Sequence, residues 1–201
     1  TGQEQLVSMS DIRVKGWLLC NRPQRIHATK DGDTITLWSQ STDEDAVKEV
    51  ASARLNYGLY PPAPNCINTL RSKEETLPYE DGSLFHGTSF QWMTSLRRNL
   101  QGASSCIQIS DALPSGELGP GILDAATHSI PHDQLQGWFP QTSSEKVAYP
   151  AWIPHIEFYG PTPKSGEVQC EIRPDGVVGS PDYPAFKVQL IHEGRPWCQF
   201  R

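Results

Sequence analysis

Two residues whose types suit proton transfer lie four positions apart in the sequence. Asp124 and His128 occur in "GILDAATHSIPH", residues 121–132. This stretch is apolar nearly all round, which predicts a short buried helix, and side chains four residues apart on a helix meet. A carboxyl group beside an imidazole can donate, accept or orient a proton. The alternative is a purely structural pair, in which the buried Asp and His satisfy each other's hydrogen bonds. The spacing alone does not distinguish the two interpretations.

The surrounding sequence indicates which elements position this pair. We expect the helix over residues 118–131, because Pro120 suits its start and Pro131 its end. Elsewhere strand patterns dominate, with predicted hairpin turns at Asp31–Gly32 and Gln101–Gly102. In "EVQCEIR", the apolar residues Val168, Cys170 and Ile172 alternate with the polar residues Gln169, Glu171 and Arg173. The sequence therefore predicts an α+β fold in which antiparallel sheet wraps around one central helix.

Composition excludes several classes of protein. The chain has 201 residues and a formal net charge of −6, which argues against a nucleic-acid surface. No apolar run approaches the roughly 18 residues that a membrane span needs, and we expect no signal peptide. The five cysteines are widely spaced without a C-x-x-C pair. We therefore expect reduced thiols and a cytoplasmic location.

Three motifs together resemble a known family. The motifs are "LFHGTSFQW", "GILDAATH" and "YPAWIPHIEFYG". They are similar to the C-terminal half of dehydratase domains from modular polyketide synthases and related fatty-acid and polyunsaturated-fatty-acid synthases, and the resemblance covers roughly residues 8–201. It implies a double hotdog fold, with antiparallel sheets each wrapped around a central helix and the first unit incomplete in this chain. Residues 1–60 would be later strands of the first hotdog unit, 61–83 a linker, and 84–201 the second unit.

The resemblance also implies roles for individual residues. The family carries D-x-x-x-Q or D-x-x-x-H on its second central helix, which matches Asp124 and His128 as catalytic residues. Asp124 would be the acid, or would position the substrate hydroxyl, and His128 would orient its carboxylate. His86, Gly87 and Phe90 of the H-G-x-x-F-Q motif are expected to bind substrate, although a plain turn residue remains the alternative for His86.

A metal and other cofactors are not expected. Asp124, His128 and His132 lie at positions i, i+4 and i+8, a spacing that could hold a metal ion. Pro131 interrupts the helix before His132, so we predict no metal site there. The resemblance implies no cofactor, because the substrate arrives on the phosphopantetheine arm of an acyl carrier protein.

The sequence departs from the family in one important respect. The family's catalytic base is a histidine in an H-x-x-x-G-x-x-x-x-P motif on the first hotdog unit. None of the six histidines here stands in such a motif. Either the chain is the Asp-bearing part of a larger dehydratase or it naturally lacks the base. In both cases we expect the isolated chain to be inactive, because elimination needs a base as well as an acid.

The expected function is dehydration of 3-hydroxyacyl thioesters on acyl carrier protein to enoyl thioesters, within a polyketide or fatty-acid synthase. Two alternatives stay open: a catalytically silent scaffold or docking domain, and a double-hotdog isomerase or cyclase. The expected partners are the acyl carrier protein and neighbouring synthase domains. A homodimer is a further candidate, and no nucleic acid or membrane is expected.

Overall fold

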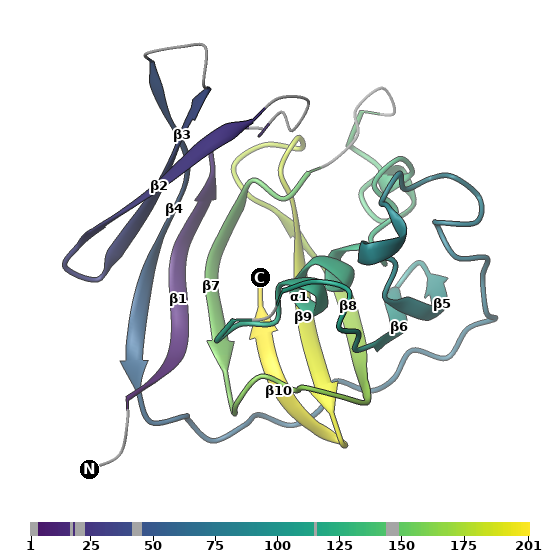
Figure 1. The fold of residues 1–201 in the computed structure, drawn as a ribbon. Coiled ribbons are helices and arrows are strands. Elements are labelled where there is room, and N and C mark those ends of the chain that lie inside the picture. The colour runs from purple at the N-terminus through teal and green to yellow at the C-terminus, as the bar shows by residue number, and fades with distance from the viewer. Residues whose placement is uncertain (1–3, 17, 19–22, 42–45, 115, 144–148) are drawn as a thin grey trace. The chain divides into compact units, whose positions relative to one another are not determined.

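The structure is a computed structural model that describes residues 4–16, 18, 23–41, 46–114, 116–143 and 149–201. In chain order its elements are β1 (Gln5–Val14), β2 (Gln24–Asp31), β3 (Thr34–Ser41), β4 (Val47–Gly58), η1 (Thr88–Phe90), β5 (Met93–Asn99), β6 (Gly102–Gln108), α1 (Pro120–Thr127), η2 (Leu135–Gly137), β7 (Trp152–Phe158), β8 (Glu167–Val177), β9 (Pro184–His192) and β10 (Arg195–Phe200) (Figure 1). Among the described residues no helix has both the length and the apolarity to cross a membrane.

The chain divides into two compact units, and the first is built from strands. Unit 1 comprises residues 1–61, 150–158 and 200, and its strands follow the order β2-β3-β4-β1-β7. The β2–β3 hairpin turns where the sequence predicted, with Asp31 opposite Thr34 and a positive φ at Gly32. Strand β7 belongs to this unit because its backbone pairs with β1, although the sequence placed it in the second half.

Unit 2 comprises residues 62–149, 159–199 and 201 and contains the helix. Its strands follow the order β10-β9-β8-β6-β5, with antiparallel pairing in the β5–β6, β6–β8 and β8–β9 ladders. The predicted turn at Gln101–Gly102 joins β5 to β6. Gly102 has a φ of 142°, and a Cβ there would collide with the backbone oxygen of Ile172. Only glycine suits this position.

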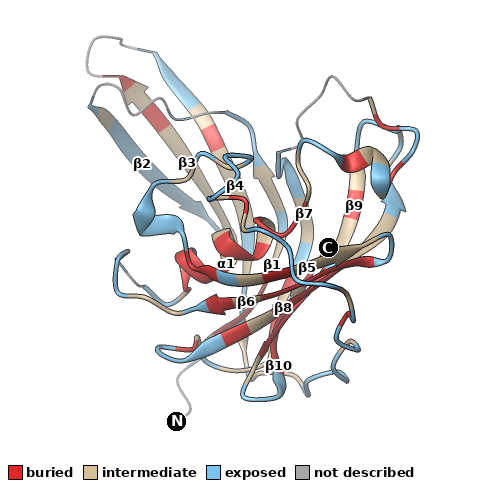
Figure 2. Ribbon diagram, turned by 90° about the vertical axis from the view of Figure 1, so that its right-hand side faces the viewer, coloured by how far each residue is buried: buried red, intermediate tan, exposed pale blue. Residues whose placement is uncertain are grey.

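Helix α1 is shorter than predicted. It ends at Thr127, with His128 as its C-cap, before the expected end at Pro131. A proline disfavours helical backbone at the residue before it, which here is Ile130. The amide of Ile130 instead donates a hydrogen bond to the carbonyl of Thr127 in a tight turn. The helix buries Gly121, Ile122, Ala125 and Ala126. Figure 2 shows buried residues on α1 and on the strands β6 and β8, and β9 and β10 carry further buried residues.

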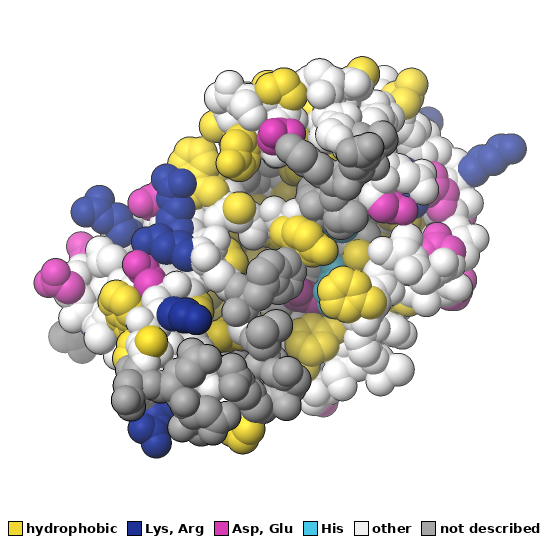
Figure 3. Space-filling model, turned by 90° about the horizontal axis from the view of Figure 1, so that it is seen from above, with side chains coloured by type: hydrophobic (Ala, Val, Ile, Leu, Met, Phe, Trp, Pro, Cys, Tyr) yellow, Lys and Arg dark blue, Asp and Glu magenta, His cyan; other side chains and the backbone are white. Residues whose placement is uncertain are grey.

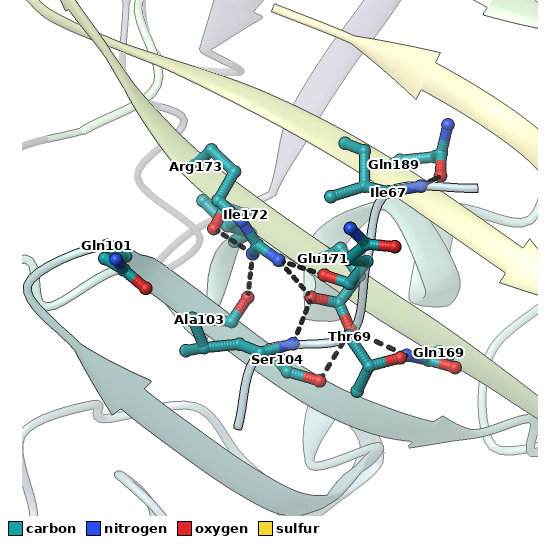
Figure 4. Close-up of polar contacts among 12 residues, drawn as sticks. Ile67, Thr69, Gln101, Ala103, Ser104, Gln169, Glu171, Ile172, Arg173 and Gln189 are labelled. Carbon is teal, nitrogen blue, oxygen red and sulfur yellow. Dashed lines mark hydrogen bonds and ion pairs between the residues drawn. The ribbon is translucent and has the colours of Figure 1, made fainter. Parts of the chain in front are cut away.

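Within the expected linker at residues 61–83, residues 62–83 belong to unit 2 and pack against its strands. The amide of Ile67 donates to Oε1 of Gln189 on β9 (2.7 Å), and the amide of Leu70 donates to Oε2 of Glu171 on β8 (3.3 Å) (Figure 4). Leu70 itself is buried. Polar side chains of the sheet thus serve as the partners that a neighbouring strand would supply.

This packing explains why Glu171 is fully buried although it lies on the polar face predicted from the sequence. Its carboxylate accepts hydrogen bonds from Ser104 Oγ (2.7 Å), Gln169 Nε2 (2.6 Å) and Arg173 NH2 (2.8 Å), besides the amide of Leu70. Burying a carboxylate is costly unless it is paired and hydrogen-bonded. Here one cation and three neutral donors meet that requirement.

We predict that Glu171→Ala lowers the free energy of unfolding by about 3 kcal/mol, because it leaves the partly buried cation of Arg173 and several donors without their acceptor. Urea denaturation followed by circular dichroism measures the change. Glu193→Ala is the matched control, since the Glu193 side chain is 86% exposed, and it should change stability by less than about 0.5 kcal/mol. Equal losses in the two variants would contradict this role for Glu171.

Candidate active site

Asp124 and His128 meet on α1, as their spacing predicted. Oδ2 of Asp124 lies 3.1 Å from Nε2 of His128. The two side chains differ in exposure, because the imidazole is 1% exposed and the carboxylate 35% exposed. The close approach does not meet the angles of a hydrogen bond, and neither atom has a hydrogen-bond partner among the described residues. The helix therefore presents a carboxylate to solvent with a buried imidazole behind it.

Tyr79 holds the other side of the imidazole. Its hydroxyl lies 2.6 Å from Nδ1 of His128, and the two rings meet edge to face. Burial raises the pKa of Tyr79 to about 12; a backbone hydrogen bond from Met93 opposes this rise, and the charge of Asp124 adds to it. The phenol is therefore protonated at neutral pH and can donate to Nδ1.

These contacts select one arrangement of protons on His128. Nε2 faces a carboxylate oxygen, so a proton on Nε2 is favoured over a lone pair. Nδ1 then carries the lone pair and accepts from the Tyr79 hydroxyl. The result is a chain of three groups in which Tyr79 fixes the imidazole and the imidazole faces Asp124.

His86 lies against the same imidazole. The ring centroids of His86 and His128 are 4.1 Å apart, and Phe85 stacks on His86 with centroids 5.5 Å apart. Burial lowers the pKa of His86, the neighbouring His128 lowers it further, and Asp124 opposes both. On the face drawn in Figure 3, histidine and acidic side chains lie beside hydrophobic ones.

The other predicted binding residues lie at the edge of this cluster. Phe90 is 40% exposed, with its ring centroid 6.4 Å from that of His86. Gly87 is exposed and precedes η1 in extended backbone. A Cβ on Gly87 would meet nothing within 4 Å, so the fold does not require glycine there. Contact of His86, Gly87 and Phe90 with substrate stays a prediction.

His132 does not join Asp124 and His128. Its Nε2 lies 3.0 Å from the carbonyl oxygen of Thr127, beyond the end of α1. Among the described residues, His86 takes its place beside Asp124 and His128 in a cluster of possible metal ligands. His86 stands 38 positions before Asp124 in the sequence (124 − 86). Sequence spacing missed this arrangement because His86 reaches the helix from a separate loop.

Packing at the start of α1 holds this loop in place. The Trp92 ring lies so close to Gly121 that a Cβ there would collide with it. Nε1 of Trp92 donates to the carbonyl of Ser89 (2.8 Å), which fixes the turn that follows His86. At the other end of the helix, the hydroxyls of Ser105 on β6 and Ser129 lie 2.6 Å apart. The helix and the loop are thereby positioned against the same sheet.

Comparison with protein families identifies the chain. The family described as "Polyketide synthase dehydratase N-terminal domain" matches residues 61–200. The chain belongs to the polyketide synthase dehydratase family. The sequence resemblance pointed to the C-terminal half of such domains, and the part of a whole dehydratase that this chain represents stays a prediction. Comparison with curated proteins gives no significant match.

Several solved structures share the fold of this dehydratase-family chain. "GphF Dehydratase 1" matches with a TM-score of 0.71 at 18% identity, covering 100% of this chain and 75% of that one. The dehydratase domain from the CurH module of the curacin polyketide synthase gives 0.72 at 16% identity, covering 97% and 75%. A trans-acyltransferase polyketide synthase enoyl-isomerase gives 0.66 at 16% identity, covering 98% and 79%.

These matches confirm a hotdog-like fold of antiparallel strands with a helix, as the sequence predicted. The incompleteness of a first hotdog unit stays a prediction, and so do the assigned boundaries at residues 60 and 84. The roles of Asp124 and His128 also stay predictions.

Tyr79 can be tested directly through its ionisation. In an alkaline titration followed by ultraviolet absorbance, we expect an ionisation near pH 12 that Tyr79→Phe removes. Because the unfolded phenol ionises near pH 10 while the folded one stays protonated, Tyr79 should make stability fall as the pH rises from about 10 to about 12. Tyr183→Phe is the control, because Tyr183 is 61% exposed. Loss of the late ionisation in Tyr183→Phe and not in Tyr79→Phe would refute the assignment.

Proposed function

We propose that the chain takes part in dehydration of 3-hydroxyacyl thioesters carried on acyl carrier protein, giving enoyl thioesters within a polyketide or fatty-acid synthase. It supplies the Asp half of the site. The observation that carries this proposal is the half-exposed Asp124 carboxyl 3.1 Å from the buried His128 imidazole, whose far nitrogen contacts Tyr79. Membership of the dehydratase family supplies the reaction class.

The reaction divides the work between two groups. A base removes the proton from Cα, the electron pair forms the Cα–Cβ double bond, and the C–O bond at Cβ breaks. The leaving oxygen takes a proton and departs as water. Asp124 donates that proton or positions the hydroxyl, while His128 holds the carboxyl group in one orientation. The base in this proposal is the histidine of the family's H-x-x-x-G-x-x-x-x-P motif, which the sequence does not contain.

The partners in this proposal are the acyl carrier protein, neighbouring synthase domains and a second copy of the domain. Arg97 and Arg98 are adjacent basic residues on β5, a pair of charges that suits an acidic carrier. They form ion pairs with Glu74 (3.4 Å) and Glu75 (2.7 Å), which favours an ordinary surface cluster over a carrier contact. The substrate comes on its phosphopantetheine arm and no cofactor is needed. Free thiols at Cys66, Cys106, Cys170 and Cys198 support a cytoplasmic location.

Asp124→Asn should abolish dehydration by this chain when it is combined with a segment bearing the histidine motif. The amide keeps the shape but cannot donate the proton, so turnover should fall by about 10² to 10⁴. His128→Gln should be milder, because glutamine can still hydrogen-bond the carboxyl group. Mass spectrometry of the carrier-bound product measures the loss of water. Turnover near that of the wild type in Asp124→Asn would refute the role of Asp124.

The 201-residue chain alone should show no measurable dehydration of the same carrier-bound substrate. General base catalysis supplies about 10² to 10⁴ in rate, and this contribution would be missing. Adding the histidine-bearing segment in trans should restore turnover. Robust dehydration by the chain alone would mean that one of its own histidines is the base, and His86 would be the first to test because it lies beside Asp124 and His128.

One neighbour favours a second candidate function. The trans-acyltransferase polyketide synthase enoyl-isomerase shares the fold over 98% of this chain. Moving a double bond requires proton transfer between two carbons without loss of water, so a single base can serve both steps. Parallel assays with an enoyl thioester and with a 3-hydroxyacyl thioester as substrate distinguish isomerisation from dehydration. Double-bond migration without loss of water from the hydroxy substrate would favour the isomerase.

A further inference from the structure

Three donor atoms converge beside α1. One nitrogen of His86, one carboxylate oxygen of Asp124 and one nitrogen of His128 all lie within 4.8 Å of one another. In a tetrahedral zinc site the metal–ligand distances are about 2.0–2.2 Å, which places neighbouring ligand atoms about 3.3 Å apart. The pair formed by Asp124 and His128, at 3.1 Å, already has that spacing. The ligand atom of His86 lies within 4.8 Å of both of them.

Each of these three side chains has a buried polar atom that lacks a hydrogen bond to the described part of the chain. Nδ1 of His86, Oδ2 of Asp124 and Nε2 of His128 are buried atoms without a hydrogen bond among the described residues. Buried polar atoms are almost always satisfied, so three such atoms in one cluster require an explanation. Their convergence is explained if they serve a common cation. We propose that His86, Asp124 and His128 form a Zn²⁺ site.

The donor set selects the class of metal. Two imidazoles and one carboxylate suit Zn²⁺, whereas Mg²⁺ and Ca²⁺ prefer oxygen ligands throughout. Three protein ligands leave the fourth position for water, as in zinc sites open to small molecules. His128 is fixed by burial in the core, while the side chain of His86 is only partly buried and can rotate toward the ion without movement of its loop.

Tyr79 supplies the outer contact that such a site needs. A histidine that binds a metal through one nitrogen usually hydrogen-bonds through the other, which fixes its tautomer. The Tyr79 hydroxyl is 2.6 Å from Nδ1 of His128. When Nε2 binds the ion, Nδ1 carries the proton and donates it to the Tyr79 oxygen. Tyr79 is thus a positioning residue whose hydroxyl changes from donor to acceptor.

The proposed site goes beyond the proposed dehydration. Zn²⁺ would bind the carboxylate oxygen of Asp124. In the proposed dehydration, the same carboxyl group transfers a proton to the substrate. Metal binding and elimination therefore exclude each other, and Zn²⁺ is an inhibitor of the site. The binding measurement needs no substrate, so failure of the dehydratase proposal leaves it unaffected.

The test is metal binding to the tag-free 201-residue chain after dialysis against a chelator. Co²⁺ is the spectroscopic probe, and Zn²⁺ then displaces it while calorimetry gives the stoichiometry and affinity. We expect one ion per chain, with the intense visible absorption of tetrahedral Co²⁺ that Zn²⁺ removes. Tyr79→Phe should weaken Zn²⁺ binding about 10-fold, and His86→Ala should weaken it further, because it removes a ligand.

His27→Ala is the matched control, because His27 is exposed on β2 and lies outside unit 2. It should bind Zn²⁺ like the wild type. His86→Ala is preferred to a substitution of the fully buried His128, and circular dichroism checks that it is folded. Equal affinity in His86→Ala and wild type, or an octahedral Co²⁺ spectrum, would overturn the proposal. So would binding that His27→Ala abolishes.

Discussion

The burial of the His128 imidazole is the constraint on which the candidate site depends. A polar ring that is 1% exposed must find partners for both nitrogens inside the protein. Tyr79 satisfies one nitrogen and Asp124 faces the other. The same burial removes water from one side of the carboxyl group, which strengthens its interaction with the imidazole. The carboxyl group of Asp124 is therefore positioned by His128, a side chain that the core holds fixed.

That constraint extends into the irregular segment before β5. Tyr79 and His86 come from a described stretch that contains no helix or strand of its own. They reach α1 because the segment is bound to the sheet, in part through an antiparallel bridge between Glu74 and Arg97. The buried Glu171 is central to this attachment, since it accepts from the amide of Leu70 while Arg173 and Ser104 satisfy its other lone pairs. The hydrogen-bond network around Glu171 and the cluster of Asp124, His128 and Tyr79 are thus parts of one arrangement within unit 2.

Local features of this arrangement could be predicted from the sequence. The contact between Asp124 and His128 follows from helical geometry, and the turn at Asp31–Gly32 follows from residue types. Contacts between segments that are distant in the sequence produce no comparable spacing or residue pattern in it. Tyr79 stands in a charged stretch that reads as a solvated loop, and the alternation in β8 placed Glu171 at a surface that another segment covers. These residues become visible only when the chain between residues 62 and 92 is placed on the sheet.

The position of the proton on His128 tests the central claim most directly. Nitrogen-detected long-range NMR correlations of the imidazoles in the metal-free protein distinguish the two tautomers, and His128→Gln assigns the signal. We predict a proton on Nε2 and a lone pair on Nδ1, because the Tyr79 hydroxyl donates to Nδ1 and Asp124 faces Nε2. A proton on Nδ1 in the metal-free protein would contradict the account.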